Sequence, residues 1–361
     1  MTTDVEQINA VLAQVVDPNT GTDIVSGRAV RGVRLDDGVV RVQVELGYPA
    51  ASQIASMRER IEQALRAAGV GPMQVEVRFK IVAHTVQRGL KVMPNVRNII
   101  AVASGKGGVG KSTVAANLAL ALAAEGARVG MLDADIYGPS QPTMLGIRGQ
   151  PLSRDGKTFD PLQGHGIQAS SIGFLIDPDQ PMVWRGPMVT SALQQLLNLT
   201  NWDDLDYLVI DMPPGTGDIQ LTLAQQVPVT GAVIVTTPQD IALLDAGKGL
   251  RMFEKVGVPI LGLVENMATH VCSQCGHEEH IFGSGGAARM AQQFSVEVLG
   301  SLPLDIRIRE DADGGRPTVV ADPDGAIART YKAIARRVAV RIAERARDLS
   351  AKMPAIKISN T

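Results

Sequence analysis

The chain has 361 residues, of which 45% are hydrophobic and 3% aromatic, and its formal net charge is −2. This length allows two domains with a substantial core, while the near-neutral charge and scarce aromatic residues argue against a nucleic-acid-binding protein. The N-terminus lacks the basic and apolar pattern of a signal peptide, and no uncharged apolar run reaches the roughly 18 residues of a membrane span. We therefore expect a soluble, cytoplasmic protein that has neither nucleic acid nor a membrane as partner.

The first 85 residues have the pattern of a small α+β domain. Apolar residues recur at helical intervals in two segments and alternate with polar residues in the strands expected between and after them. Residues 86–96, which include a glycine and a proline, are expected to form a linker to the next domain. The expected elements are a helix over residues 3–16, strands over 29–35 and 40–46 that meet in a hairpin at Asp37-Gly38, a helix capped by Ser52 that runs through Ala68, and a strand over 74–79.

After the linker the pattern changes to strands that alternate with helices. This alternation predicts an α/β fold with a mainly parallel sheet flanked by helices on both faces. We expect this second domain over residues 97–350 and a flexible tail over 351–361. The expected elements are strands over 99–103, 128–132, 207–211, 231–236 and 260–265, helices over 114–124, 189–199, 219–226, 242–256, 285–294 and 322–349, and an irregular insertion over 148–166. We expect the last helix to dock on the sheet with a solvated basic face that includes Arg336.

A glycine-rich loop, Gly-Lys-Gly-Gly-Val-Gly-Lys-Ser-Thr, follows the first strand of the second domain. It matches the Walker A pattern in the strand–loop–helix context that the pattern requires. Its glycines allow successive backbone N–H groups to face one anion, and the helix N-terminus adds positive potential. Lys111 would reach the β- and γ-phosphates of a nucleotide, and the Ser112 hydroxyl would bind Mg²⁺. We assign phosphate binding to the whole loop: Gly105, Lys106, Gly107, Gly108, Val109, Gly110, Lys111, Ser112 and Thr113.

Carboxylates at the ends of two further strands complete the expected phosphate site. Asp133 and Asp135 follow the second strand, where one could hold Mg²⁺ and the other could orient an attacking water. Alternatively, both are solvated loop acids or helix caps. Asp211 ends an apolar strand as a Walker B carboxylate does, and would bind Mg²⁺. Gly215, in the proline- and glycine-rich loop that follows, could donate its N–H to the γ-phosphate.

The two cysteines of the chain lie three residues apart, as Cys272 and Cys275. In a reducing compartment such a pair favours metal or redox chemistry over a structural disulfide. With His277 or His280 the pair could complete a mononuclear zinc site, or it could act as a redox dithiol. The spacing alone leaves both alternatives open.

Several of these motifs together resemble one known family. The extra lysine of the phosphate loop, Lys106, resembles the deviant Walker A ATPases, which include the nitrogenase iron protein and the septum-site and partition ATPases. With Glu265-Asn-Met267 and the cysteine pair, the chain closely resembles the Mrp/ApbC-type iron–sulfur cluster carrier ATPases. The resemblance implies slow, Mg²⁺-dependent ATP hydrolysis, a Lys106 that crosses a dimer interface, an Asp135 that positions water, and an Asn266 that reads the adenine edge. Lys106, Lys111 and Asp135 would then be the catalytic residues.

The number of thiols supports the same interpretation. A 4Fe–4S cluster generally requires four thiolates, whereas this chain has two cysteines. Two copies related by a twofold axis would supply four, and such dimers are the commonest assembly. We therefore expect a homodimer that holds a bridging cluster on Cys272 and Cys275 and passes it to apo-proteins. The alternative is a positioning or partition-type ATPase that binds DNA or membrane and whose cysteines hold structural zinc.

Overall fold

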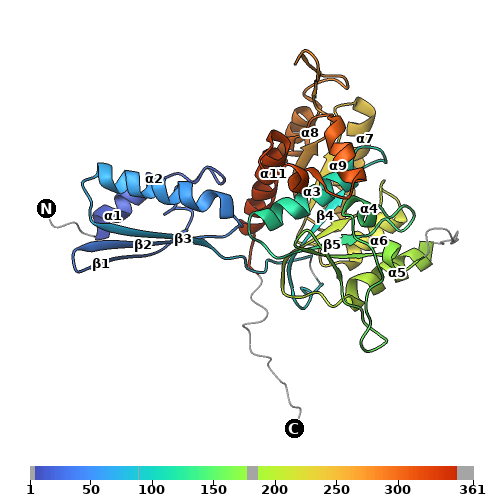
Figure 1. Cartoon of the computed structure of the whole chain (residues 1–361), viewed down its shortest axis with the longest axis horizontal. Helices are drawn as coiled ribbons and strands as arrows, with labels where there is room; N and C mark the ends of the chain where they lie inside the picture. Colours follow the sequence, from blue (N-terminus) through green and yellow to red (C-terminus); the bar gives the residue numbers. More distant parts are fainter. Residues whose placement is uncertain (1–4, 88, 177–185, 348–361) are drawn as a thin grey trace, which may run out of the picture.

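The computed structural model describes residues 5–87, 89–176 and 186–347 of the chain. Two bodies lie side by side, a small N-terminal domain and a larger domain with a central sheet (Figure 1). The tail expected over residues 351–361 lies outside the described residues. Among the helices that are described, none combines the length and the apolar character needed to cross a membrane.

The small domain packs two helices on one face of a three-stranded sheet of order β1-β2-β3. Strands β1 and β2 are antiparallel, whereas β2 and β3 are parallel. Asp37 and Gly38 join β1 to β2 with φ angles of 49° and 78°, as a two-residue type I′ hairpin requires, so the predicted hairpin is confirmed. The elements are α1 (Val5–Leu12), β1 (Val30–Asp36), β2 (Val39–Leu46), the 3-10 turn η1 (Ala51–Gln53), α2 (Ile54–Ala67) and β3 (Met73–Phe79).

Two local predictions in this domain are wrong. The first helix ends at Leu12 rather than at residue 16, because i→i−3 bonds such as Val15 N to Leu12 O tighten its last turn. Helix α2 begins at Ile54 without a side-chain cap. The Ser52 hydroxyl instead donates to the carboxylate of Glu125 in the larger domain, at 2.7 Å. The hydrogen bond that the hydroxyl donates to this charged carboxylate is stronger than the one it would accept from a backbone N–H group of α2.

The larger domain is built on an eight-stranded sheet of order β13-β10-β9-β4-β8-β5-β7-β6. All neighbouring strands are parallel except β6, which pairs antiparallel with β7 at one edge, so the predicted mainly parallel sheet is confirmed. The insertion expected to be irregular contains β6. The strands are β4 (Val96–Ala103), β5 (Val129–Asp133), β6 (Leu162–Gly164), β7 (Ile167–Ser171), β8 (Leu205–Asp211), β9 (Gly231–Thr236), β10 (Ile260–Glu265) and β13 (Val298–Ser301).

Helices cover both faces of this sheet, as the alternating pattern predicts. Along β4, Ile100 and Val102 belong to the core that contains α3 and α11, whereas Ile99 and Ala101 belong to the core with α5, α6 and α7. The helices are α3 (Lys111–Ala124), α4 (Gln141–Met144), α5 (Gly186–Leu199), α6 (Asp218–Gln226), α7 (Asp240–Lys255), α8 (Gly286–Phe294), α9 (Ile306–Asp313), α10 (Thr318–Ala321) and α11 (Ala326–Ala343), with the 3-10 turn η2 at Ile172–Phe174.

The last helix is shorter than predicted, and its basic face is not uniformly solvated. Helix α11 spans Ala326–Ala343 and buries Tyr331, Ile334 and Val338 on its apolar face, as expected. Arg336 is wrongly predicted to be solvated: its side chain is only 13% exposed and forms an ion pair with Glu125. Its Nε also donates to Asn19 of the small domain at 3.2 Å. Helix α11 therefore contacts the small domain as well as the sheet.

Candidate nucleotide site and cysteine hairpin

The glycine-rich loop lies between the carboxyl end of the central strand β4 and the start of α3. Gly108 and Gly110 both have a φ of 79°, a conformation that other residues adopt at a cost. A Cβ at Gly105 would lie 2.1 Å from the backbone of Asp245, so this position has no room for a side chain. The Ser104 hydroxyl donates to Lys106 O at 2.8 Å and holds the first turn of the loop. The loop therefore has the backbone shape of a phosphate cradle.

Lys111, the first residue of α3, forms a buried ion pair with Asp211 at the end of β8. The two side chains are 6% and 0% exposed, and the lysine also donates to the Ser112 hydroxyl at 3.1 Å. The structure thus brings together the predicted phosphate-binding lysine, the predicted magnesium-binding hydroxyl and the predicted Walker B carboxylate. A nucleotide phosphate would compete with Asp211 for the same ammonium group.

Gln141 belongs to this cluster, although the sequence analysis did not select it. Its side-chain amide donates to Asp211 Oδ2 at 2.9 Å and to Ser112 O at 3.1 Å. The residue is 1% exposed, and its Oε1 has no hydrogen-bond partner among the described residues. It fixes the carboxylate of Asp211 against the phosphate loop. The only sequence signal was its position just after the Asp133–Ser140 segment, which is not a motif in itself.

Asp133 is fully buried and shapes the loop that follows β5. Its carboxylate accepts the N–H groups of Ser140 and Gln141, each at 3.0 Å, at the start of α4. Burial and then the charge of Asp211 raise its pKa to about 7, although the N–H groups of Gln141 and Asp135 and the charge of Lys111 oppose the shift. Asp133 therefore makes the contacts of a helix cap, which is one of the alternatives predicted for this residue. A second role at a metal ion stays a prediction.

Asp135 is half-buried and lies next to the same charges. Its N–H donates to Asp133 Oδ1 at 3.2 Å. Burial raises the pKa of its carboxyl, Lys111 opposes this shift, and Asp211 adds to it. A carboxylate with a raised pKa near a phosphate site is suited to accept a proton from water.

The two remaining predicted nucleotide contacts, Gly215 and Asn266, are both hydrogen-bonded at the phosphate loop, to Ser104 just before it and to Val109 within it. Gly215 has a φ of 96°, and its N–H donates to Ser104 O at 3.0 Å, so contact with a γ-phosphate would require this bond to be exchanged. Asn266, which follows β10, donates from Nδ2 to Val109 O at 2.9 Å. Its Nδ2 also lies 2.2 Å from the position that a Cβ at Gly110 would occupy. The amide of Asn266 is thus part of the loop's support.

Lys106 is half-buried. Its ammonium group forms no ion pair or hydrogen bond with the side chains that the structure describes. This lysine is therefore available for a ligand or a second chain.

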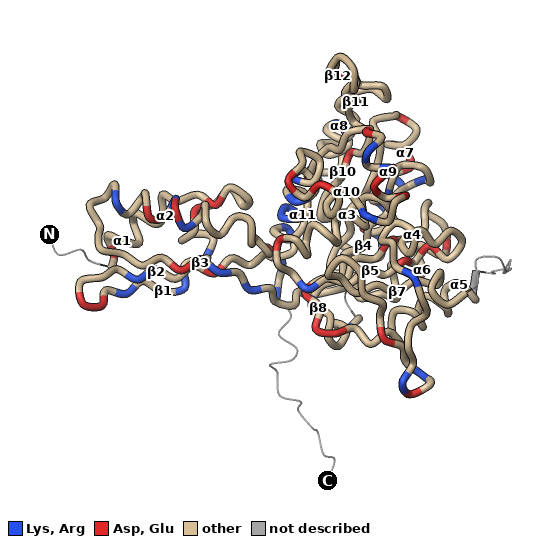
Figure 2. Tube along the Cα trace, viewed as in Figure 1, with Lys and Arg blue, Asp and Glu red and all other residues tan. Residues whose placement is uncertain are grey.

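The cysteine pair lies on a small hairpin that projects beyond α8 at the top of the larger domain (Figures 1 and 2). Strands β11 (His270–Val271) and β12 (Glu278–Glu279) form its base. Cys272 N donates to His277 O and Gly276 N donates to Cys272 O, both at 2.9 Å, which closes a tight turn around the pair. Both thiols are free, and Cys275 is exposed.

The turn lowers the pKa of one of the thiols. Backbone N–H groups of Cys275 and Gln274 lower the pKa of Cys272, with further contributions from the Cys275 side chain and from His270. A thiolate is the form that binds metal. The hairpin therefore suits Cys272 to metal ligation more than to an inert structural role.

The single-chain zinc site is not assembled in this structure. Among residues 5–87, 89–176 and 186–347, no three His, Cys, Asp or Glu side chains gather as a metal site would require. His280 is one of the proposed ligands, and its Nδ1 donates to Ala268 O at 2.9 Å, which leaves its Nε2 open. Among the described residues, the two thiols are therefore not gathered with a third side chain of these types.

Comparison with known proteins places these features in one family. The profile of the NUBPL iron-transfer P-loop NTPases, a ParA-type family, matches residues 95–339, and a profile of iron-sulfur cluster assembly proteins matches residues 5–79. An iron-sulfur cluster carrier protein of Pseudomonas fragi is 63% identical over 74% of this chain and 94% of its own length. One of Haemophilus influenzae is 51% identical over 93% of this chain and 91% of its own length.

A solved structure is also similar. It is a nucleotide-binding protein of Archaeoglobus fulgidus in complex with ADP, 38% identical to this chain, with a TM-score of 0.56. The match covers 64% of this chain and 90% of that one. The fold, the phosphate loop and these matches agree, and the chain belongs to the family of NUBPL iron-transfer P-loop NTPases.

Proposed function

We propose that this protein is an ATP-dependent carrier of iron–sulfur clusters. It binds and slowly hydrolyses ATP at the phosphate loop, and two copies hold a bridging 4Fe–4S cluster that is passed to apo-proteins. The observation that carries the proposal is the cysteine hairpin. It offers two free thiols at the surface of a P-loop domain, without a third ligand among the described residues. The names of the relatives, which are iron-sulfur cluster carrier proteins, support it.

The homodimer follows from ligand number. Four thiolates hold a 4Fe–4S cluster, and Cys272 and Cys275 are the two cysteines of the chain. A twofold axis near the hairpin tip would bring the second pair to the same cluster, since each tip projects from its domain. Lys106, which is unpaired within the described chain, would reach the partner's nucleotide in the same dimer.

The nucleotide site would work through the residues described above. Lys111 would leave Asp211 for the β- and γ-phosphates, while Ser112 and Asp211 would hold Mg²⁺, which supplies charge neutralisation of the phosphates. Asp135 would orient the attacking water and accept its proton on a carboxylate oxygen. Gly215 N–H would exchange Ser104 O for the γ-phosphate. Asn266 Oδ1, which accepts no hydrogen bond from the described residues, would be free to meet the adenine edge.

One hydrogen bond and a few residues of chain join the phosphate loop to the hairpin. Asn266 donates a hydrogen bond to Val109 O in the loop, and the hairpin begins at His270, four positions further along the chain. His270 is itself held by a hydrogen bond from its ring to Leu304 O at 3.0 Å. A shift of Asn266 on nucleotide binding would therefore move the start of the hairpin. This gives ATP turnover a direct way to change how the thiols of two copies meet.

The test is anaerobic reconstitution of the full chain with iron and sulfide, followed by metal and sulfide analysis, visible spectroscopy and measurement of the oligomeric state. We expect about four irons per dimer, with broad visible absorption, and transfer to an apo-acceptor. Cys272→Ala and Cys275→Ala should each lose the cluster, whereas Ser273→Ala, in the same exposed turn, should keep it. A colourless monomer that binds one zinc would contradict the proposal.

A further inference from the structure

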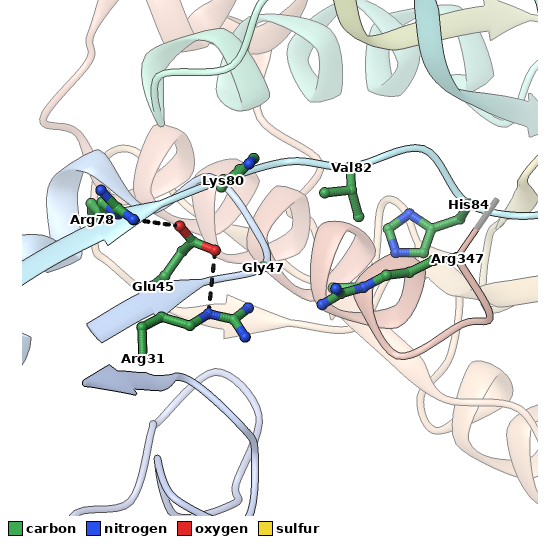
Figure 3. Close-up of a pocket in the computed structure, with 9 residues that line it drawn as sticks. Arg31, Glu45, Gly47, Arg78, Lys80, Val82, His84 and Arg347 are labelled. Atoms are coloured by element: carbon green, nitrogen blue, oxygen red, sulfur yellow. Dashed lines mark ion pairs between the residues drawn. The ribbon is translucent and has the colours of Figure 1, made fainter. Parts of the chain in front are cut away.

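A pocket of about 400 Å³ lies where the small domain meets the end of α11. Its wall is formed by the strands of the small sheet, the segment that follows β3, and the last described residues of the chain (Figure 3). It adjoins a second hollow of about 870 Å³, with which it shares Arg31, Glu45 and Arg347. Neither hollow contains a residue of the phosphate loop or of the cysteine hairpin.

The pocket and the nucleotide site lie at opposite ends of strand β4. His84, in the wall of the pocket, donates a hydrogen bond from Nδ1 to Asn98 Oδ1 at 3.0 Å, near the amino end of β4. The phosphate loop follows the carboxyl end of the same strand. The two sites therefore lie at opposite ends of the central strand, and the pocket is a separate site.

Positive charge dominates the wall of this pocket. Arg31, Arg78, Lys80 and Arg347 face a single carboxylate, Glu45. Glu45 forms ion pairs with Arg31 at 3.3 Å and with Arg78 at 3.0 Å. Lys80 and Arg347 have no carboxylate partner among the described residues. In Figure 3 the guanidinium groups of Arg31 and Arg347 extend into the pocket from opposite sides, and Figure 2 shows basic residues gathered at this junction.

The excess of positive charge belongs to the smaller pocket, because the adjoining hollow is also lined by Asp17, Asp23 and Glu344. Two basic groups nevertheless lie beside the smaller pocket. Arg345 lines the adjoining hollow, and its buried Nε has no hydrogen-bond partner among the described residues. Burial lowers the pKa of His84, and the charges of Arg347 and Arg345 lower it further, although the hydrogen bond that His84 donates to Asn98 opposes this shift. The chain as a whole carries a net charge of −2, so the positive field is a local feature.

We propose that this interdomain pocket binds a small anion that carries two or more carboxylate or phosphate groups. Its volume is in the range of small-molecule sites and accommodates such an anion. Arginine presents a fork of N–H donors that matches carboxylate and phosphate oxygens, and Lys80 adds a point charge. An anion held between Arg31 of β1 and Arg347, which follows α11, would contact both domains. It would brace the small domain against α11, independently of whether the protein carries a cluster.

The test is titration of the full chain with pyrophosphate and with tricarballylate, by calorimetry and thermal melting. Ionic strength is held constant with chloride, because screening alone would otherwise change the result. A Lys111→Ala chain removes the lysine of the phosphate loop, so that binding there is separated from binding in the pocket. The pocket variant is Lys80→Ala with Arg347→Ala. The matched control is Arg41→Ala, which removes an exposed arginine of β2 whose carboxylate partner, Asp36, lies outside the pocket.

We expect saturable binding and a higher melting temperature for the wild type, for Arg41→Ala and for Lys111→Ala. The pocket variant should bind at least about tenfold more weakly, since it lacks two charged donors. Preference for pyrophosphate or for tricarballylate would identify which anion chemistry the pocket takes. The proposal is overturned if neither anion binds saturably, if the pocket variant binds as tightly as the wild type, or if Lys111→Ala alone abolishes binding.

Discussion

Glu125 offers the sharpest test of how the two domains are held together. It follows α3 directly, is 0% exposed, and accepts from both the N–H and the hydroxyl of Ser52, at 3.1 and 2.7 Å. It also forms an ion pair with Arg336 of α11, which is 13% exposed. One carboxylate therefore joins α3 to α11 within the larger domain and joins both to the small domain.

The structure sets the size of the effect of Glu125→Ala. Removal of one partner from a buried ion pair costs about 3–5 kcal/mol, because the remaining charge is left uncompensated. Arg336 is slightly exposed and donates a hydrogen bond to Asn19. We therefore expect Glu125→Ala to lower the free energy of unfolding by about 3 kcal/mol, at the lower end of this range. Ser52→Ala should cost only about 1 kcal/mol, because it removes a single hydroxyl bond that tethers the small domain.

The assay is urea unfolding of the full chain, together with limited proteolysis of the segment over residues 86–96. Glu125→Ala should lower the free energy of unfolding and speed cleavage, whereas Ser52→Ala should mainly speed cleavage. Glu59→Ala removes an exposed glutamate of α2 and serves as the control, with an expected change within about 0.5 kcal/mol. A loss below about 1 kcal/mol for Glu125→Ala would refute the argument that this carboxylate compensates a buried charge.

Further predictions concern the nucleotide site. Lys111→Ala should weaken ATP binding by at least about tenfold, because a charged donor to the phosphates is lost; calorimetry checks this, and unchanged affinity would exclude the proposed contact. Lys106→Ala should keep ATP affinity but lose hydrolysis and nucleotide-dependent dimerisation, as turnover and sedimentation would show; wild-type turnover would contradict a role in trans. Asp133 has a pKa raised from 3.8 to about 7, so the folded chain keeps a proton that the unfolded chain has lost. Its contribution should therefore lower the free energy of unfolding as pH rises from about 4 to about 7, with no further loss above that range, and Asp133→Asn should remove this slope in urea titrations at several pH values.

The parts of the site that lie in one continuous stretch could be predicted from the sequence. The phosphate loop needs only glycines, a lysine and a hydroxyl in a fixed order after an apolar strand, and the structure forms it at Gly105–Gly110. The meeting of Lys111 with Asp211 could also be anticipated, because parallel strands end at one edge of the sheet. Their roles at a nucleotide stay predictions.

Contacts that depend on packing could not be predicted. Gln141 reaches Asp211 across 70 positions of the chain, and Ser52 reaches Glu125 across 73. A serine before an apolar helical pattern is a common helix cap, and nothing local shows that a distant carboxylate will compete for its hydroxyl. Arg336 likewise belongs to a run of basic residues that is typical of a solvated helix face. The distinction lies in the tertiary neighbours.

Helix α3 is buried on nearly every side, so much of its sequence is constrained by volume alone. Ala115, Ala119 and Ala121 are each 0% exposed, and larger side chains there would overpack the core at a cost of about 1–3 kcal/mol. These alanines touch neither phosphate nor metal in the arrangement proposed above. A saturation mutagenesis screen would nevertheless score them as intolerant, alongside the loop glycines. Loss of function on substitution in α3 therefore does not identify a catalytic or ligand-binding residue unless protein abundance is measured separately from turnover.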